Sequence, residues 1–328
     1  MSVPASTVRL QLNSSFDLYA AARVCDHLAD LGAGGVYLSP LLPSERSSDH
    51  GYDVVRFDTV DPARGGPEGW ARLLAAAHAR GLRVVLDIVP NHTGVTDASQ
   101  NPAWQDLLRL GRSSPYAPWF DVDWAPAGGR VLLPVLGDRF DASRLTVGGD
   151  ELDYAGQRFP IAPGTGSGTP EQVLEAQHYA LVERRRADTE QNYRRFFAVS
   201  TLAGLRVEDP DVFAATHEQV GRWLREDRID GLRVDHPDGL ADPRGYLARL
   251  RELAGPGAWI VVEKILEPGE RLPPDWPVDG TTGYDALAEV GGLFVDPAAE
   301  PALDAGYRSL TGDGRDYAAH VEAGKRTA

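Results

Sequence analysis

The chain has 328 residues, of which 48 are acidic and 33 basic, so its formal net charge at pH 7 is −15. This charge argues against a nucleic-acid-binding surface, because phosphate binding requires clustered positive charge. We find no run of about 18 apolar residues and no secretory leader pattern, so we expect a cytoplasmic protein without a membrane span. At this length a barrel with an insertion fits as well as two ordinary domains do.

Strand-like and helix-like segments alternate in the first part of the chain. Three segments have the apolar pattern of buried strands: 7 to 12, 34 to 40 and 82 to 90. Between them, residues 16 to 32 and 66 to 81 carry apolar side chains at helical spacing, and each of these runs ends at a glycine. Because parallel neighbours need a crossover connection, the alternation predicts a parallel sheet.

The alternation breaks between residues 95 and 205. This segment is rich in Gly, Pro and Asp, with a strand-like piece at 130 to 136 and a helix-like run at 171 to 187. It is far longer than an ordinary connection of about 2 to 6 residues. We therefore interpret 95 to 205 as a subdomain inserted after the third strand, of the kind that shapes a substrate cleft.

The alternation then resumes and continues to the end of the chain. Helices are expected at 210 to 226 and 243 to 254, and strands at 230 to 235 and 258 to 265; a shorter unit and a final helical stretch follow. About six strands have the pattern that closes an eight-stranded barrel. The sequence predicts an α/β fold, a (β/α)8-type TIM barrel that is incomplete at its C-terminus. Its first part spans residues 1 to 94 and its second, truncated part spans 206 to 328.

Cysteine and histidine usage gives no sign of a disulfide or a metal centre. Cys25 is the only cysteine and stands in a helical pattern, so we interpret it as a buried structural thiol. The eight histidines show no HxH or HExxH spacing, and no acidic loop has the pattern of a calcium site. We expect neither a metal nor a cofactor.

Polar side chains stand where three of the predicted strands end. They are Asp87 with Asn91 and His92, then Asp235, then Glu263 with Lys264. In barrels of this type catalytic groups gather at the carboxyl ends of the strands. Asp235 and Glu263 are one strand-to-strand repeat apart, so we expect them on adjacent strands, facing one pocket.

Paired carboxylates on neighbouring strands are the groups that retaining glycoside chemistry uses, at a separation of about 5 to 5.5 Å. The two roles require different pKa values. Arg233 precedes Asp235 by two residues and is expected to keep that carboxylate ionised as the nucleophile. Glu263 follows an apolar run without such a cation, which favours it as the protonated acid. Lys264 should point to the other face of its strand.

Each of these residues also has an ordinary structural interpretation. Arg233 and Asp235 can form a structural ion pair at a strand end, because such pairs also perturb pKa values. His92 can cap a loop. Tyr52 can be a core aromatic, although its setting in "DHGYDVV" is also typical of a platform on which a sugar stacks.

Taken in order, the segments "HGYDV", "DIVPNH", "GLRVDHPDG" and "VVEKI" resemble the conserved segments of the α-amylase superfamily of glycoside hydrolases. The longer stretches "QNYRRFFAVSTLAGLRVE", "HPDGLADP" and "EKILEPGE" are similar to one family within it, the maltooligosyl trehalose synthases. This resemblance covers nearly the whole chain. The shorter segments are common to many amylases, whereas the longer stretches are far more selective.

The resemblance implies an intramolecular transglucosylation of a maltooligosaccharide. Asp235 would attack the anomeric carbon of the penultimate glucose while Glu263 protonates the leaving oxygen. The freed glucose would turn over within the pocket and attack the covalent intermediate through its anomeric hydroxyl, which leaves an α,α-1,1 linkage. Water must be excluded during this step, because it would hydrolyse the intermediate.

The resemblance also implies roles in substrate binding. Tyr52 would stack on the sugar, His92 would hydrogen-bond to it, and Arg233 would orient Asp235. His236 and Lys264 would line the pocket near the leaving glucose. The complete set of implied substrate-binding residues is His50, Tyr52, Asp87, Asn91, His92, Arg233, His236 and Lys264.

One departure from the family pattern leaves alternatives open. No segment after residue 296 resembles the part of the family that carries a third catalytic carboxylate, so we expect the chain to correspond to an N-terminal part of such a protein. A hydrolytic or other transferring member of the superfamily would release reducing sugar, and a non-catalytic glucan-binding fragment would bind without turnover. A metal-dependent barrel hydrolase would need clustered histidines. We expect a maltooligosaccharide ligand, no nucleic-acid or membrane partner, and a monomer.

Overall fold

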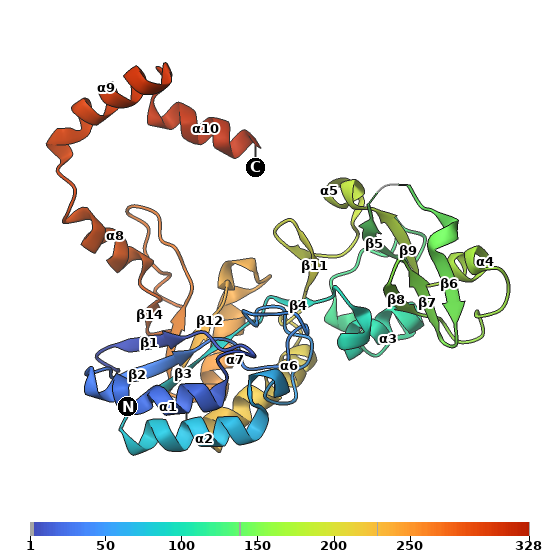
Figure 1. Cartoon of the computed structure of the whole chain (residues 1–328), viewed down its shortest axis with the longest axis horizontal. Helices are drawn as coiled ribbons and strands as arrows, with labels where there is room; N and C mark the ends of the chain where they lie inside the picture. Colours follow the sequence, from blue (N-terminus) through green and yellow to red (C-terminus); the bar gives the residue numbers. More distant parts are fainter. Residues whose placement is uncertain (1–2, 138, 228, 328) are drawn as a thin grey trace. The chain divides into compact units, whose positions relative to one another are not determined.

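The computed structural model of the chain describes residues 3–137, 139–227 and 229–327. The chain divides into two compact units, Met1–Thr282 and Gly283–Ala328 (Figure 1). In the described residues no helix combines the length and the apolar character that a membrane crossing would need.

Six parallel strands form the main sheet of the first unit. In spatial order they are β1 (Thr7–Leu10), β2 (Gly35–Leu38), β3 (Arg83–Ile88), β12 (Gly231–Val234), β13 (Trp259–Val262) and β14 (Gly280–Thr281). The predicted parallel sheet of about six strands is confirmed. The sheet has two open edges, β1 and β14, and so fits an incomplete barrel.

The strands are apolar for a physical reason. In β3 and β12 all residues except Arg83 are buried, so these strands read as nearly continuous apolar runs, as expected for a parallel sheet covered on both faces. Glycines open β2 and β12 because space is short there: a side chain at Gly231 would meet the carbonyl oxygen of Trp259 at 2.4 Å.

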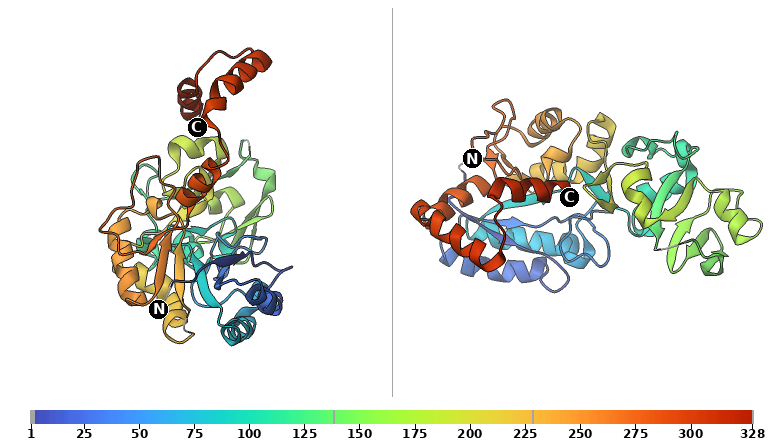
Figure 2. Two further views of the ribbon diagram at one scale, coloured as in Figure 1. Left: turned by 90° about the vertical axis from the view of Figure 1, so that its left-hand side faces the viewer. Right: turned by 90° about the horizontal axis from the view of Figure 1, so that it is seen from above.

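Four helices connect these strands: α1 (Leu18–Asp30), α2 (Gly66–Ala79), α6 (Pro210–Arg225) and α7 (Pro243–Ala254). Aspartate side chains cap the first turns of α1, α6 and α7. Helices α1 and α2 lie side by side (Figures 1 and 2). Cys25 is buried in α1, which confirms its interpretation as a structural thiol.

The long segment between β3 and α6 forms its own small sheets. Its elements are β4 (His92–Gly94), α3 (Pro102–Leu110), β5 (Val131–Leu136), β6 (Leu145–Gly148), β7 (Glu151–Tyr154), β8 (Gln157–Pro160), α4 (Pro170–Glu175), β9 (Tyr179–Glu183), α5 (Ala187–Glu190), β10 (Arg195–Phe196) and β11 (Val199–Gly204). Strands β5 and β9 pair with each other, and β6, β7 and β8 form an antiparallel sheet. The β10–β11 hairpin pairs with β4, which directly follows β3 (Figure 1).

The prediction of a helix over residues 171 to 187 is wrong for most of its length. Helix α4 ends at Glu175, and Tyr179–Glu183 forms strand β9 parallel to β5. Tyr179 is fully buried, and its hydroxyl donates to the carbonyl oxygen of Pro160 at 3.1 Å. The tertiary pairing with β5 therefore overrides a helical pattern that was only local.

The second unit consists of helices α8 (Tyr284–Gly292), α9 (Glu300–Thr311) and α10 (Tyr317–Thr327). They confirm the helical stretch predicted for the end of the chain. Several large apolar side chains of this unit are exposed, among them Leu293, Phe294 and Leu310.

The core position of Leu86 in β3 gives a test of the sheet. Its side chain is fully buried, so Leu86→Ala should lower the free energy of unfolding by about 2 to 5 kcal/mol. Leu31→Ala is the matched control, because Leu31 is 67% exposed and its truncation should cost less than about 0.5 kcal/mol. Urea unfolding of both variants measures the difference, and equal values would contradict this placement of β3.

Candidate active site

Three carboxylates stand at the carboxyl ends of neighbouring strands. Asp87 lies in β3, Asp235 directly follows β12, and Glu263 directly follows β13. The backbone ladder continues past the strand ends: Asp235 donates its N–H to the carbonyl of Ile88 at 2.9 Å, and Glu263 donates to Val234 at 2.9 Å. The sheet register therefore places Asp235 and Glu263 on adjacent strands, as the sequence predicted.

Arg233 joins these three carboxylates. Its Nη1 lies 2.8 Å from Oδ1 of Asp87 and 2.7 Å from Oδ1 of Asp235, and its Nη2 lies 2.8 Å from Oε1 of Glu263. Only 6% of Arg233 is exposed, so these contacts are made largely out of water. One guanidinium thus fixes the positions of both candidate catalytic carboxylates.

Asp87 is the most buried member of the cluster. It accepts hydrogen bonds from the hydroxyls of Tyr37 at 2.7 Å and Tyr52 at 2.6 Å, in addition to the bond from Arg233. Burial raises the pKa of Asp87, and the three donors counteract that effect. The sequence prediction missed Tyr37. The available signal was its position in β2, just before Ser39, because β2 pairs with β3 and so lies beside the strand that carries Asp87.

Burial raises the pKa of Asp235 to about 7. Arg233 counteracts this shift, while the nearby carboxylates of Asp87 and Glu263 add to it. The expectation that Arg233 would simply keep Asp235 ionised is therefore incomplete, because desolvation outweighs the ion pair in the protein without ligand.

The surroundings of Glu263 also differ from those that we predicted. We predicted that it lacks a neighbouring cation, but Arg233 contacts it as closely as it contacts Asp235. What distinguishes the two carboxylates is exposure, because the side chain of Glu263 is 26% exposed and that of Asp235 only 10%. Sequence spacing could not show that one guanidinium spans two strands.

Tyr52 lies next to this cluster in the loop after β2. Its ring is 5.9 Å from the guanidinium carbon of Arg233, and its hydroxyl accepts a hydrogen bond from Nη2 of Arg9 at 3.0 Å. His50 stacks on the Tyr52 ring at 5.9 Å between centroids, and its Nδ1 accepts the backbone N–H of Tyr52 at 3.0 Å. The structure brings Tyr52 and His50 together and adds Arg9, which the sequence prediction missed.

Asn91 and His92 are buried at the start of the segment after β3. Nε2 of His92 contacts the backbone oxygen of Tyr52 at 3.2 Å, and Nδ1 lies 3.4 Å from the side-chain nitrogen of Asn91. Oδ1 of Asn91 accepts from Arg194 at 3.1 Å. Burial lowers the pKa of His92 to about 4, so its imidazole is neutral at neutral pH.

The β10–β11 hairpin adds two aromatic rings that the sequence prediction did not select. The Phe196 ring centroid lies 4.5 Å from that of His92 and 5.0 Å from that of His236. Phe197 packs against the same His236 at 4.9 Å, is 73% exposed and has a left-handed φ of 46°. An aromatic pair in "QNYRRFFAV" was the available signal, because a large apolar side chain at a hairpin turn is unusual.

His236 and Lys264 occupy the loops that follow β12 and β13. His236 has a left-handed φ of 43°, and its backbone N–H donates to Oε2 of Glu263 at 3.4 Å. Nζ of Lys264 lies 3.0 Å from Asp238 and 3.0 Å from Glu270. In the part of the chain that the structure describes, no ion pair joins Lys264 to Asp235 or Glu263, so Lys264 connects the two loops rather than the two carboxylates.

A search of the described residues for groups of three or more His, Cys, Asp or Glu side chains that could hold a metal ion found none. The arrangement can instead supply a buried nucleophile, a proton donor, a cation that holds both, and aromatic surfaces beside them.

Comparisons with known proteins agree on one family. The α-amylase catalytic-domain family matches residues 17–246. A curated protein of Mycobacterium tuberculosis (strain H37Rv), assigned as a maltooligosyl trehalose synthase, is 51% identical over 305 residues, which is 92% of this chain and 40% of that protein. The intracellular maltogenic amylase of Bacillus subtilis (strain 168) is 34% identical over 139 residues, or 42% of this chain and 21% of the relative.

Among solved structures, maltooligosyltrehalose synthase from Arthrobacter ramosus superimposes with a TM-score of 0.93 and 57% identity. The match covers 96% of this chain and 42% of that one. The chain thus spans 40% of the length of the maltooligosyl trehalose synthase relative from Mycobacterium tuberculosis.

The raised pKa of Asp235 gives a test of the site by stability alone. In the unfolded chain this carboxyl ionises near its ordinary pKa of about 3.9, whereas in the folded chain it ionises at about 7. The folded chain therefore loses stability as pH rises between these values, and Asp235→Asn removes that loss. The free energy of unfolding of Asp235→Asn, relative to the unchanged chain, should rise by about 1 to 3 kcal/mol between pH 4 and pH 7.5.

Urea unfolding at several pH values measures this difference. Asp49→Asn is the control, because Asp49 is exposed and its variant should show no such pH dependence. A flat difference for Asp235→Asn would show that Asp235 is not desolvated in the folded protein.

Proposed function

The chain belongs to the α-amylase family, and within it we propose an intramolecular transglucosylation that converts the reducing-end α-1,4 linkage of a maltooligosaccharide into an α,α-1,1 linkage. One observation carries the proposal. The buried guanidinium of Arg233 holds Asp235 and Glu263 side by side at the ends of adjacent strands. The identity to relatives named as maltooligosyl trehalose synthases supports the same reaction.

The first step is a displacement at the anomeric carbon of the penultimate glucose. Arg233 occupies Oδ1 of Asp235, and Oδ2 has no hydrogen-bond partner among the described residues, so Oδ2 is the attacking oxygen. The bond from the anomeric carbon to O4 of the last glucose breaks. Glu263 gives its proton to that oxygen, and a glycosyl ester of Asp235 forms.

The second step reverses the proton transfer. The released glucose stays bound and presents its anomeric hydroxyl to the anomeric carbon of the glycosyl ester. Glu263, now a carboxylate, takes the hydroxyl proton while the new bond forms, and the carboxylate of Asp235 leaves. Two inversions at the same carbon give net retention, so the product linkage has the α configuration.

The geometry of Glu263 supports its role as the acid. Its Oε1 forms an ion pair with Nη2 of Arg233 at 2.8 Å, whereas Oε2 receives only the long 3.4 Å bond from the backbone N–H of His236. Oε2 is therefore the oxygen that can carry the proton.

The proposed sugar contacts follow the aromatic surfaces. Tyr52 supplies a half-buried ring beside Arg233, and Phe196 and Phe197 stand on the Glu263 side through their contacts with His236. We assign His92 a hydrogen bond to the sugar. Nδ1 makes this bond in place of its long contact with Asn91, because Nε2 already contacts the backbone oxygen of Tyr52.

The domain division and setting of the enzyme are part of the proposal. We assign residues 95 to 205 to an inserted subdomain that shapes the substrate cleft, and residues 1 to 94 and 206 to 328 to the two parts of the barrel. The separate small sheets between β3 and α6 support the insertion. We further propose a cytoplasmic monomer, and the net charge of −15 supports the absence of a nucleic-acid partner.

Proton NMR of maltopentaose incubated with the chain tests the reaction. The reducing-end anomeric signals should disappear while an α,α-1,1 signal grows. Asp235→Asn should slow this conversion roughly a thousandfold or more, because the attacking oxygen is lost, and Asp49→Asn should leave it unchanged. New reducing ends would indicate a hydrolase instead, and unchanged sugar in a folded sample would favour a non-catalytic glucan-binding fragment.

Glu263→Gln separates the acid from the nucleophile. The variant keeps the acceptor for Arg233 but carries no proton to donate, so conversion of maltopentaose should fall at least about a hundredfold. An aryl maltooligosaccharide with a good leaving group needs no acid, and its cleavage should recover in Glu263→Gln but not in Asp235→Asn. Equal losses on both substrates would assign the proton donor to another residue.

A further inference from the structure

A cavity of about 830 Å³ lies outside the candidate active site. It is an open cavity lined by the loop after β2, the start of α3 and the side of α6, and none of the residues predicted for the active site lines it. Its volume falls within the range of roughly 300 to 1,000 Å³ that is usual for ligand pockets. The catalytic scheme above makes no use of it.

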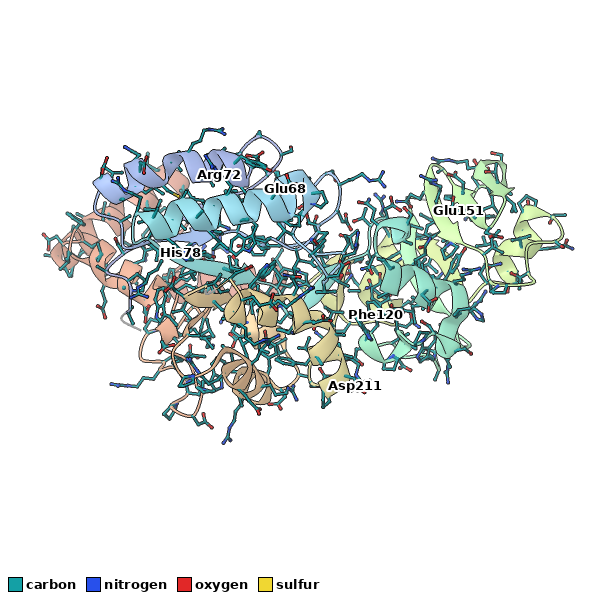
Figure 3. All side chains as sticks on the ribbon, turned by 90° about the horizontal axis from the view of Figure 1, so that it is seen from below. Glu68, Arg72, His78, Phe120, Glu151 and Asp211 are labelled. Atoms are coloured by element: carbon teal, nitrogen blue, oxygen red, sulfur yellow. The ribbon has the colours of Figure 1, made fainter. Side chains whose placement is uncertain are left out.

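Three aromatic side chains form one wall of this cavity. Phe57, Tyr116 and Trp119 are all half-buried, and the Trp119 ring lies 6.1 Å from Phe57 and 5.1 Å from Tyr116, edge to face in both cases. The backbone oxygen of Trp119 accepts the N–H of Arg206 at 2.8 Å, which ties the wall to the approach to α6. Figure 3 labels the neighbouring positions Phe120 and Asp211, where the segment after β3 meets α6. The three rings thus pack against one another and form a continuous platform.

Four side-chain polar groups of the cavity lining, those of Arg46, Glu218, Tyr116 and Trp119, are uncommitted. Arg46 and Glu218 line the cavity, are exposed, and form no ion pair within the described residues. The hydroxyl of Tyr116 and the indole N–H of Trp119 likewise have no hydrogen-bond partner in that part of the chain. The cavity therefore combines an apolar ring surface with free donors and a free acceptor.

The place of the cavity relative to the sheet shows that it is not a site where a further strand would be added. A further strand added to the sheet would pair with an edge strand, β1 or β14. The cavity instead adjoins the loop after β2 and the helix between β3 and β12, in the interior of the strand order. It is not an edge onto which the sheet would grow.

We propose that this cavity is a second carbohydrate-binding site, which holds part of an α-1,4-glucan chain away from Asp235 and Glu263. A pyranose ring has an apolar C–H face that packs on aromatic rings and a rim of hydroxyls that pair with arginine and carboxylate groups. The choice of an α-1,4-glucan among neutral sugars rests on the proposed function. A chain anchored there would raise the local concentration of glucan at the active site.

Calorimetric titration with maltoheptaose tests this site in the full chain carrying Asp235→Asn, which prevents turnover. Trp119→Ala removes the centre of the platform and should weaken the cavity-bound component roughly tenfold or more. Ala215→Trp should have the same effect by filling the cavity, because Ala215 is exposed on α6 and lines it. An unchanged unfolding midpoint in Ala215→Trp excludes misfolding as the cause.

Trp124→Ala is the matched control. Trp124 is also a half-buried tryptophan of the segment after β3, but it packs against Arg112 at 5.4 Å and lies outside the cavity lining. Its variant should bind maltoheptaose as the parent does. Binding that is unaffected by both Trp119→Ala and Ala215→Trp would overturn the inference.

The outcome is independent of catalysis. If the two cavity variants lose binding while the chain without Asp235→Asn does not convert maltopentaose, the second site is supported and the proposed transglucosylation fails. Conversion of maltopentaose together with binding that ignores both cavity substitutions would leave the reaction standing and remove the second site.

Discussion

The buried guanidinium of Arg233 is the constraint on which the candidate site depends. A charge with only 6% exposure needs partners, and here the partners come from three strands, β3, β12 and β13. Removing one partner of such a buried set typically costs about 3 to 5 kcal/mol. The order of the central strands and the spacing of the carboxylates therefore depend on each other: the sheet supplies the carboxylates, and the cation holds the strand ends in register.

The same contacts divide the chemical roles. Because Arg233 takes one oxygen of Asp235 and one of Glu263, each carboxylate keeps a second oxygen for a reacting group. In the proposed reaction Asp87 takes no part, because three donors, two of them tyrosine hydroxyls, use its acceptor capacity. Aromatic rings of a hairpin that is distant in the sequence pack against His236, whose backbone N–H donates to Glu263. The proposed transfer to a bound sugar requires that water be excluded, because water would hydrolyse the intermediate.

The cavity beside α6 has the opposite character from the catalytic cluster. The cluster is largely buried, charged and joined by ion pairs, whereas the cavity wall of Phe57, Tyr116 and Trp119 is half-exposed. The side-chain polar groups of Tyr116 and Trp119 have no hydrogen-bond partner among the described residues. Those properties suit reversible binding of a flexible neutral chain and supply no acid or nucleophile. Both features adjoin the segment between β3 and α6, so that segment contributes to both proposed sites.

The sequence by itself determined five strands of the main sheet (β1, β2, β3, β12 and β13), the flanking helices and the acidic residues at the strand ends, because periodicity and strand-end chemistry are local properties. Only the tertiary structure decided which groups meet. It turned Tyr179–Glu183 into a strand through pairing with β5 and gave Glu263 the same cation as Asp235. It also brought Tyr37 and Phe196 to the site. Such contacts join residues far apart in the chain, and burial, which raises the pKa of Asp235, exists only in the folded protein.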